Sequence, residues 1–315
     1  MRTTVVKPNR LKKGDVISLV APASAPASRE RIEQGVKYLE RLGYRVKVGK
    51  HVEAQHGYLA GTDDERLEDL NGAIRDRETR AIFTLRGGYG TPRLLPHVDY
   101  VALRKDPKII VGYSDITALQ LALFARIGLV SFSGPMVAVE MWNTMDAFTE
   151  EHFWRLLTSP KKIGPLVNPP GHETHAYGKG SVTGRLVGGN LALVVSNLST
   201  PYSPSFKDTL LFLEDVDEAP HRIDRMLIQL RNAGVFEKVN GLILGTFIDC
   251  IPSDPSKPHL TVPQVLDEFV RSMKIPVLTD LQFGHTSPKL TIPIGVNAKL
   301  SAVGNRVEIL EGAVI

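Results

Sequence analysis

Short apolar segments alternate with amphipathic ones through the first half of the chain, and this alternation limits the fold more than any other feature. Residues 16–20 and 81–85 are apolar and typical of buried strands, whereas residues 44–48 alternate apolar with basic side chains, as in a half-buried strand. Apolar side chains recur at helical spacing before Gly43 and again after Thr62. Repeated strand–helix units favour a parallel sheet with helices on both faces.

A serine follows one of these strands at the start of a helix. Residues 109–111 are β-branched, Ser114 comes shortly after them, and apolar side chains then recur until Gly128, which stands where a C-cap would. A tight turn of this kind exposes Oγ at the positive end of the helix and aims backbone N–H groups at a developing oxyanion. Ser114 is therefore a candidate nucleophile. The alternative is that Ser114 only N-caps the helix.

Three segments are expected to end at the same edge of the sheet. Residues 21–22, the glycine-rich stretch 86–90 and Ser114 each follow a predicted strand, and functional groups gather at the carboxyl ends of parallel strands. The glycines permit a sharp turn and a close approach of the backbone to a bound group. An N–H group of this stretch and that of Asp115 are candidate oxyanion donors, although a plain flexible turn would also explain the glycines.

The composition changes in the middle of the chain. Pro, Gly and Lys are frequent from 161 to 180, which we interpret as a linker. It separates an N-terminal α/β domain, residues 1–160, from a C-terminal domain, residues 181–315. Within the second domain, residues 210–213 form an apolar strand candidate and residues 289–315 are typical of β structure.

Candidates for an acid and a base lie in this second domain. Glu214 directly follows an apolar run, so it is the member of a four-carboxylate cluster that we expect to be partly buried. The cluster has no histidine at helical spacing and does not resemble a calcium loop, so it does not predict a metal site. His285 follows a strand predicted at 276–278, although a histidine at a strand end is commonly structural or exposed. We expect His172, His175 and His259 to be exposed.

Composition argues against several function classes. The net charge of +4 is not concentrated in any block of Lys or Arg, which gives no case for nucleic acid. The only cysteine, Cys250, cannot form an internal disulfide, and we expect a packed thiol rather than a nucleophile. No run approaches the roughly 20 apolar residues of a membrane helix, and the first residues lack the apolar core of a signal peptide. We therefore expect a cytoplasmic protein with no membrane partner.

Several of these pieces occur together in one known family. The matching segments, in chain order, are 61–62, 65–71, 86–90, 112–115, 132–136, 188–191, 213–215, 222–227 and 283–285. With this ordered set, which spans nearly the whole chain, the sequence resembles the LD-carboxypeptidases of bacterial cell-wall recycling.

The resemblance implies a triad of Ser114, Glu214 and His285, in which His285 takes the proton of Ser114 and Glu214 orients the imidazole. It implies an oxyanion hole formed by the backbone N–H groups of Gly88 and Asp115. The implied fold is α/β, with an N-terminal parallel sheet flanked by helices, a C-terminal mixed β/α domain and the active site between them. The implied enzyme is a homodimer that removes the terminal D-alanine from murein tetrapeptides and needs no metal or cofactor.

Some assignments stay open at this point. Arg86 is well placed in sequence to hold the free carboxylate that an exopeptidase must bind, and the alternative is an ion pair with a structural acid. The related microcin C self-immunity peptidase cuts an aminoacyl- or peptidyl-nucleotide amide with the same triad and needs an aromatic surface for the base. Trp142 is a candidate for that surface, whereas Trp154 lies in a helical pattern typical of a core residue. A two-domain binding protein would use Ser114 only as a cap.

Overall fold

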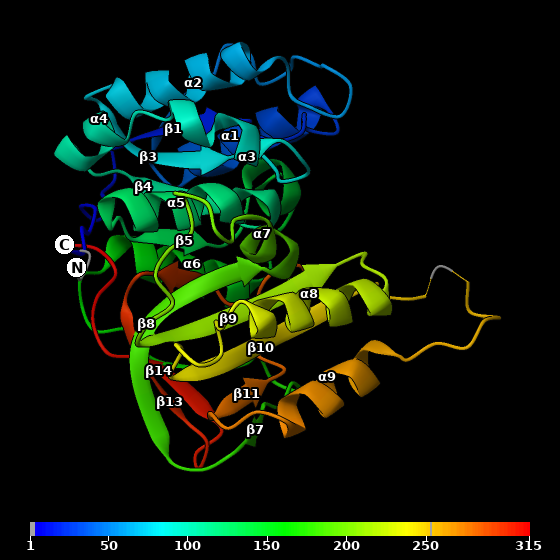
Figure 1. Ribbon diagram of the computed structural model, residues 1–315. Coiled ribbons are helices and arrows are strands. Elements are labelled where there is room, and N and C mark those ends of the chain that lie inside the picture. Colours follow the sequence, from blue (N-terminus) through cyan, green and yellow to red (C-terminus); the bar gives the residue numbers. More distant parts are fainter. Residues whose placement is uncertain (1–3, 253) are drawn as a thin grey trace.

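The computed structural model describes residues 4–252 and 254–315. The chain builds two sheets, one of six strands and one of eight, which lie one above the other in Figure 1. The first part of the chain contains β1 (Val16–Val20), α1 (Arg29–Arg41), β2 (Arg45–Val48), α2 (Asp63–Arg75), β3 (Thr79–Thr84), α3 (Thr91–Leu94), η1 (Leu95–His97), α4 (Tyr100–Lys105), β4 (Ile109–Gly112), η2 (Ser114–Ile116), α5 (Thr117–Ile127), β5 (Ser131–Ser133), η3 (Val137–Met141) and α6 (Ala147–Thr158). The second part contains β6 (Gly164–Leu166), β7 (His175–Tyr177), β8 (Ser181–Asn190), α7 (Leu191–Ser196), β9 (Thr209–Val216), α8 (Pro220–Asn232), β10 (Gly241–Ile248), α9 (Val262–Arg271), β11 (Val277–Thr279), β12 (Ile292–Ile294), β13 (Asn297–Ser301) and β14 (Arg306–Ile309).

The first sheet has the order β12-β5-β4-β3-β1-β2, and β1 to β5 run parallel. Successive side chains of a strand point to opposite faces, so Ile82 and Phe83 belong to separate apolar clusters. Phe83 shares its cluster with Leu39 of α1 and Phe153 of α6, whereas Ile82 shares its cluster with Leu70 of α2. The predicted parallel sheet with helices on both faces is confirmed.

The strand predicted at 44–48 is more exposed than its pattern suggests. β2 pairs only with β1 and therefore forms an edge of the sheet. Val46 is half-buried, but Val48 has a relative exposure of 46%. Alternation alone predicted three inward side chains, and of these only Tyr44 is buried, because the edge position leaves Val46 and Val48 partly or largely exposed.

The second sheet mixes parallel and antiparallel strands, as the resemblance implied. β8, β9, β10 and β11 run parallel at its centre. β13, β14 and β6 extend one side in antiparallel pairs, and β7 closes the other side. Figure 1 shows α8 and α9 lying along one face of this sheet.

The segment 161–180, interpreted from its composition as a linker, contributes two short strands to the second sheet. β6 and β7 both fall within this range and form the two outermost strands. Each has only three residues, and Pro165 of β6 is tolerated because an edge strand leaves one side of its backbone unpaired. The proline- and glycine-rich composition of this segment is therefore compatible with short strands at the edges of a sheet.

The chain also returns from the second domain to the first sheet. β12 pairs antiparallel with β5, with Ile292 opposite Ser133. The segment from His285 to β12 thus runs beside the N-terminal half of the molecule. No helix within the described residues is long and apolar enough to cross a membrane.

Candidate active site

Three turns meet at the carboxyl edge of the first sheet, as predicted. Ser24 follows β1, the Gly87-Gly88 pair follows β3 and Ser114 follows β4. A Cβ on Gly87 would lie 2.7 Å from Cβ of Ser114, so the absence of a side chain lets the two turns touch. Gly88 has φ +113°, and a Cβ there would overlap Oγ of Ser24. The glycine pair therefore packs the β3 turn between Ser24 and Ser114.

The backbone of Ser114 adopts a left-handed conformation. Its φ is +63°, a value that costs a non-glycine residue about 1–3 kcal/mol and that concentrates at functional sites. Helix α5 has Ile116 as its N-cap, without a side-chain hydrogen bond. No hydrogen bond of the described residues uses Ser114 Oγ as a cap, so the helix-cap alternative does not describe this turn.

His285 and Glu214 form a tight pair that comes from the second sheet. His285 Nδ1 lies 2.7 Å from Glu214 Oε2, and the backbone N–H of His285 donates to the same oxygen over 3.3 Å. A carboxylate oxygen accepts, so the tautomer with the proton on Nδ1 completes this hydrogen bond and offers Nε2 as an acceptor. The side chains of Glu214 and His285 are 2% and 16% exposed. Gly284 has φ +83°, and a Cβ there would overlap the Glu214 carboxylate.

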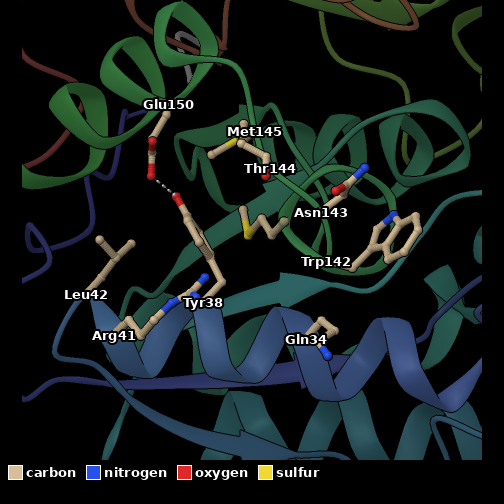
Figure 2. Close-up of a pocket in the computed structure, with 10 residues that line it drawn as sticks. Gln34, Tyr38, Arg41, Leu42, Trp142, Asn143, Thr144, Met145 and Glu150 are labelled. Atoms are coloured by element: carbon tan, nitrogen blue, oxygen red, sulfur yellow. Dashed lines mark hydrogen bonds between the residues drawn. The ribbon is translucent and has the colours of Figure 1, made fainter.

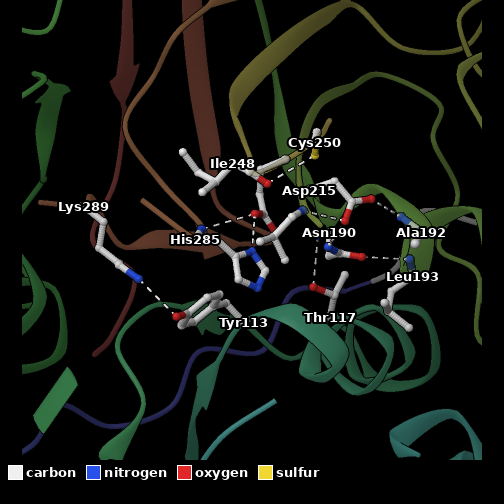
Figure 3. A network of polar contacts seen from close by, with 12 residues as sticks. Tyr113, Thr117, Asn190, Ala192, Leu193, Asp215, Ile248, Cys250, His285 and Lys289 are labelled. Carbon is white, nitrogen blue, oxygen red and sulfur yellow. Dashed lines mark hydrogen bonds and ion pairs between the residues drawn. The ribbon is translucent and has the colours of Figure 1, made fainter. Parts of the chain in front are cut away.

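The serine turn and the histidine loop meet through Tyr113. The Tyr113 ring contacts the His285 ring edge-on, with 4.9 Å between centroids and 71° between planes. Figure 3 shows the imidazole between Tyr113 and the acidic end of β9. Tyr113 directly precedes Ser114, so this contact brings the predicted nucleophile and base to one interface. Hydrogen bonds between such groups often tighten only in the complex with substrate.

A second polar network ties the two sheets together beside this pair (Figure 3). Asp215 accepts hydrogen bonds from Asn190 Nδ2 over 2.8 Å and from the backbone of Ala192 over 3.1 Å. The backbone N–H of Asn190 donates to Thr117 Oγ1, at the start of α5, over 3.1 Å. Burial raises the pKa of Asp215 to about 6, and the neighbouring Glu214 adds to this shift. The sequence placed Asp215 in a carboxylate cluster but gave no signal for its partners.

The two predicted oxyanion donors are Asp115, which follows Ser114, and Gly88, which follows the glycine packed against Ser114. The N–H of Asp115 belongs to the first turn of η2, where N–H groups have no partner within a helix. The Asp115 carboxylate points elsewhere and accepts the backbone N–H of Thr91 over 2.8 Å. Burial raises the pKa of this carboxyl group above its usual range. Gly88 remains the second candidate, held in its turn by the contact with Ser24.

Arg86 does not form the structural ion pair that was its alternative. Its Nη1 donates to the carbonyl oxygen of Ala25 over 3.3 Å, and the side chain is only half-buried. Among the described residues, no carboxylate lies within ion-pair distance of Arg86. Its guanidinium therefore keeps most of its donors for another partner.

The other residues singled out in the sequence lie apart from this site. Trp154 is half-buried and packs against the core, as its helical pattern predicted, and its Nε1 donates to Tyr38 Oη over 2.7 Å. Trp142 lines a hollow of about 480 Å³ (Figure 2), and the Arg31 guanidinium lies 4.3 Å from its ring centroid. None of Ser114, Glu214 and His285 lines this hollow.

The expectations for the cysteine and the other histidines are confirmed, with one omission. Cys250 is buried, and burial raises its pKa to about 11. The exposed histidines include His172, His175 and His259. The sequence gave no sign that His152 would be buried, because it directly follows two acidic residues, Glu150 and Glu151. Within residues 4–252 and 254–315, no group of three or more His, Cys, Asp or Glu side chains is arranged to hold a metal ion.

Comparison with known proteins matches both halves of the chain. The family model described as the LD-carboxypeptidase N-terminal domain matches residues 17–134, and that described as the LD-carboxypeptidase C-terminal domain matches residues 183–300. A Bacillus subtilis protein named probable murein peptide carboxypeptidase is 39% identical over 94% of this chain and 91% of its own length.

Solved structures of similar proteins share the whole fold. The muramoyltetrapeptide carboxypeptidase from Oxalobacter formigenes has a TM-score of 0.81 at 31% identity, covering 94% of this chain and 98% of its own. The microcin C7 self immunity protein MccF has a TM-score of 0.89 at 29% identity, covering 98% of this chain and 99% of its own.

Proposed function

This chain belongs to the LD-carboxypeptidase family, and we propose that it is a serine carboxypeptidase that removes the terminal D-alanine from murein tetrapeptides. The observation that carries the proposal is the 2.7 Å contact of His285 Nδ1 with the buried Glu214, beside the left-handed turn of Ser114. The names of relatives in Bacillus subtilis and Oxalobacter formigenes support murein peptides as the substrate class.

In the proposed mechanism, Ser114 Oγ attacks the carbonyl carbon of the amide that joins the L-centre of the third residue to D-alanine. His285 Nε2 accepts the serine proton, and Glu214 stabilises the resulting imidazolium through Nδ1. The N–H groups of Gly88 and Asp115 donate to the oxyanion. The C–N bond then breaks, and the imidazolium gives its proton to the amine of D-alanine. Water, deprotonated by His285, hydrolyses the acyl-enzyme ester and restores Ser114.

The test is mass spectrometry of murein tetrapeptide incubated with the wild-type protein and with Ser114→Ala. We expect the wild type alone to release one alanine. An intact tetrapeptide with both proteins would refute the substrate assignment, and an aminoacyl-nucleotide amide would then be the next substrate to assay. Release of alanine by both proteins would refute Ser114 as the nucleophile.

Arg86 is the proposed ligand of the substrate's terminal carboxylate. Its support is a guanidinium with one hydrogen bond, to Ala25, at the same sheet edge as Ser114. Loss of a charge-assisted hydrogen bond is worth about 1.5–3 kcal/mol, so Arg86→Ala should raise KM about 10-fold or more. Arg104→Ala, on the exposed side of α4, is the matched control. Equal KM values for both variants and the wild type would contradict this role.

The proposal includes a homodimer, which the family resemblance implies, and a cytoplasmic location, which was expected from the composition. The lone, buried thiol of Cys250 suits a reducing compartment. Light scattering should give twice the chain mass of 34.6 kDa, and a mass equal to one chain would contradict the homodimer.

A further inference from the structure

A buried group of three polar side chains lies on the side of His285 away from Glu214. Tyr113 and Lys289 are 4% and 3% exposed, and the Glu140 side chain is 15% exposed. Tyr113 lies between β4 and Ser114, Glu140 belongs to η3, and Lys289 comes from the loop between β11 and β12. The group thus joins two segments of the N-terminal half to the segment that carries His285.

The three side chains are bonded to one another. Glu140 Oε1 accepts from Lys289 Nζ over 2.6 Å and from Tyr113 Oη over 2.8 Å. Lys289 Nζ also lies 3.2 Å from Tyr113 Oη and 4.2 Å from the centroid of its ring. Glu140 Oε2 accepts the backbone N–H of Met136 over 2.8 Å, and the backbone N–H of Lys289 donates to Thr149 Oγ1 over 2.9 Å. Figure 3 shows Lys289 reaching Tyr113 below the imidazole.

Both ends of this group lie close in sequence to a residue of the proposed triad. Tyr113 directly precedes Ser114, and Lys289 follows His285 by four residues. The Tyr113 ring also contacts the imidazole, at 4.9 Å between centroids. Glu214 holds Nδ1 of the ring and the backbone N–H of His285, and the Glu140 group connects the same loop to the residue that precedes Ser114.

Stability alone does not explain such a group. A buried ion pair loses about as much free energy through desolvation as it gains from its charges, and its best-attested use is to select one arrangement of the parts that it joins. The parts joined here are the turn of Ser114 and the loop of His285, which are 171 residues apart in sequence and are carried by different sheets.

We propose that Tyr113, Glu140 and Lys289 form a clamp that sets the distance between Ser114 Oγ and His285 Nε2. They are positioning residues, and none of them needs to touch the substrate. The inference rests on the proposed roles of Ser114 and His285. Because a misplacement of about 1 Å can lower a rate about 100-fold, loosening the clamp should slow attack by Ser114 without weakening substrate binding.

The test is the rate at which a fluorophosphonate modifies Ser114, followed by intact-protein mass spectrometry. Ser114 Oγ attacks phosphorus, fluoride leaves and His285 takes the proton, so the rate reports the serine–histidine geometry without any murein peptide. Lys289→Met removes the cation and keeps the stem, and Tyr113→Phe removes one hydroxyl and keeps the ring. We expect labelling to slow about 10- to 100-fold in Lys289→Met and several-fold in Tyr113→Phe.

Lys108→Met is the matched control. Lys108 is a fully buried lysine that pairs with Asp106 over 2.7 Å and donates to the Thr79 carbonyl, at the end of β4 opposite Ser114. We expect Lys108→Met to lower the melting temperature as Lys289→Met does but to label at the wild-type rate. On murein tetrapeptide, Lys289→Met should lower kcat and leave KM nearly unchanged.

Each result decides the proposal. Wild-type labelling rates in folded Lys289→Met and Tyr113→Phe would overturn the clamp and leave the nucleophile assignment intact. Equal slowing in Lys108→Met would also overturn it, because the effect would then follow general stability. If Lys289→Met does not fold, Tyr113→Phe alone decides. If wild-type Ser114 is not labelled at all, the proposed function and the clamp both fail.

Discussion

The buried His152 should make the fold sensitive to acid, and its contribution can be isolated with one substitution. Burial, with a smaller contribution from Arg155, lowers the pKa of His152 from 6.5 to about 4. The ring is 7% exposed, and Nδ1 accepts the backbone N–H of Thr291, 3.2 Å away. His152 is therefore neutral in the folded protein at neutral pH. Thr291 precedes β12, so the bond links α6 to the segment that follows the histidine loop.

The sign and size of the effect follow from proton linkage. Between pH 6.5 and 4 the unfolded chain binds a proton at His152 that the folded chain does not, so the free energy of unfolding falls as the pH falls. At about 1.4 kcal/mol for each pKa unit, the full shift is worth ~3 kcal/mol. About 2 kcal/mol of this is lost between pH 7.5 and 5.

His152→Asn is the informative variant, because the Asn carbonyl oxygen can still accept the Thr291 N–H and does not ionise. Urea unfolding at pH 7.5 and pH 5, followed by tryptophan fluorescence, gives the free energy of unfolding of both proteins. At pH 7.5 the variant should be less stable, because the smaller side chain leaves a cavity. At pH 5 the difference between the two free energies of unfolding should shift by about 2 kcal/mol in favour of the variant. Parallel pH dependence of the two proteins would refute the reasoning.

Three further substitutions test other parts of the account. Glu214→Gln keeps an acceptor for the two N–H groups of His285 but removes the charge, so kcat should fall about 100- to 10,000-fold, and an unchanged kcat would contradict the role of Glu214. Gly88→Ala places a Cβ against Ser24 Oγ and strains φ +113°, so kcat should fall about 100-fold in the tetrapeptide assay, and normal turnover would argue against an oxyanion donor there. Burial raises the pKa of Asp215 to about 6, so this carboxyl group binds a proton more readily in the folded protein than in the unfolded chain. Its contribution to the free energy of unfolding therefore falls as the pH rises from 4 to 6. Between pH 5 and 7.5, the free energy of unfolding of Asp215→Asn, measured in urea, should therefore rise by about 1 kcal/mol relative to that of the wild type. An opposite trend would contradict the raised pKa of Asp215.

Local patterns predicted the parts of the fold that depend on neighbours in sequence. The alternation of strands and helices predicted the first sheet, and the helical spacing after Thr62 predicted α2, which Thr62 and Glu65 open with a capping box. Parallel pairing also predicted that the turns after β1, β3 and β4 share one edge of the sheet. Gly128 adopts φ +70° and ends α5, where the pattern required a cap.

Contacts between distant segments were not predictable in the same way. Nothing in the three-residue strand Ile292–Ile294 indicates that it pairs with β5 rather than with its neighbours in sequence. Lys289 reads as a solvent-exposed lysine until that pairing brings it beside Glu140. The left-handed φ of Ser114 is also invisible in the sequence, because a serine after a strand is compatible with an ordinary cap.

The central claim is that Ser114 forms a covalent acyl-enzyme while D-alanine leaves, and rapid acid quenching tests it most directly. Wild-type protein is mixed with murein tetrapeptide, quenched within milliseconds to seconds and analysed by intact mass and peptide mapping. Glu214→Gln should extend the lifetime of any adduct by slowing hydrolysis. The account predicts an added tripeptide acyl group on the peptide that contains Ser114, with free D-alanine equal to the sum of this adduct and the free tripeptide. Release of D-alanine with no adduct in either protein, or an adduct on another residue, would contradict the account.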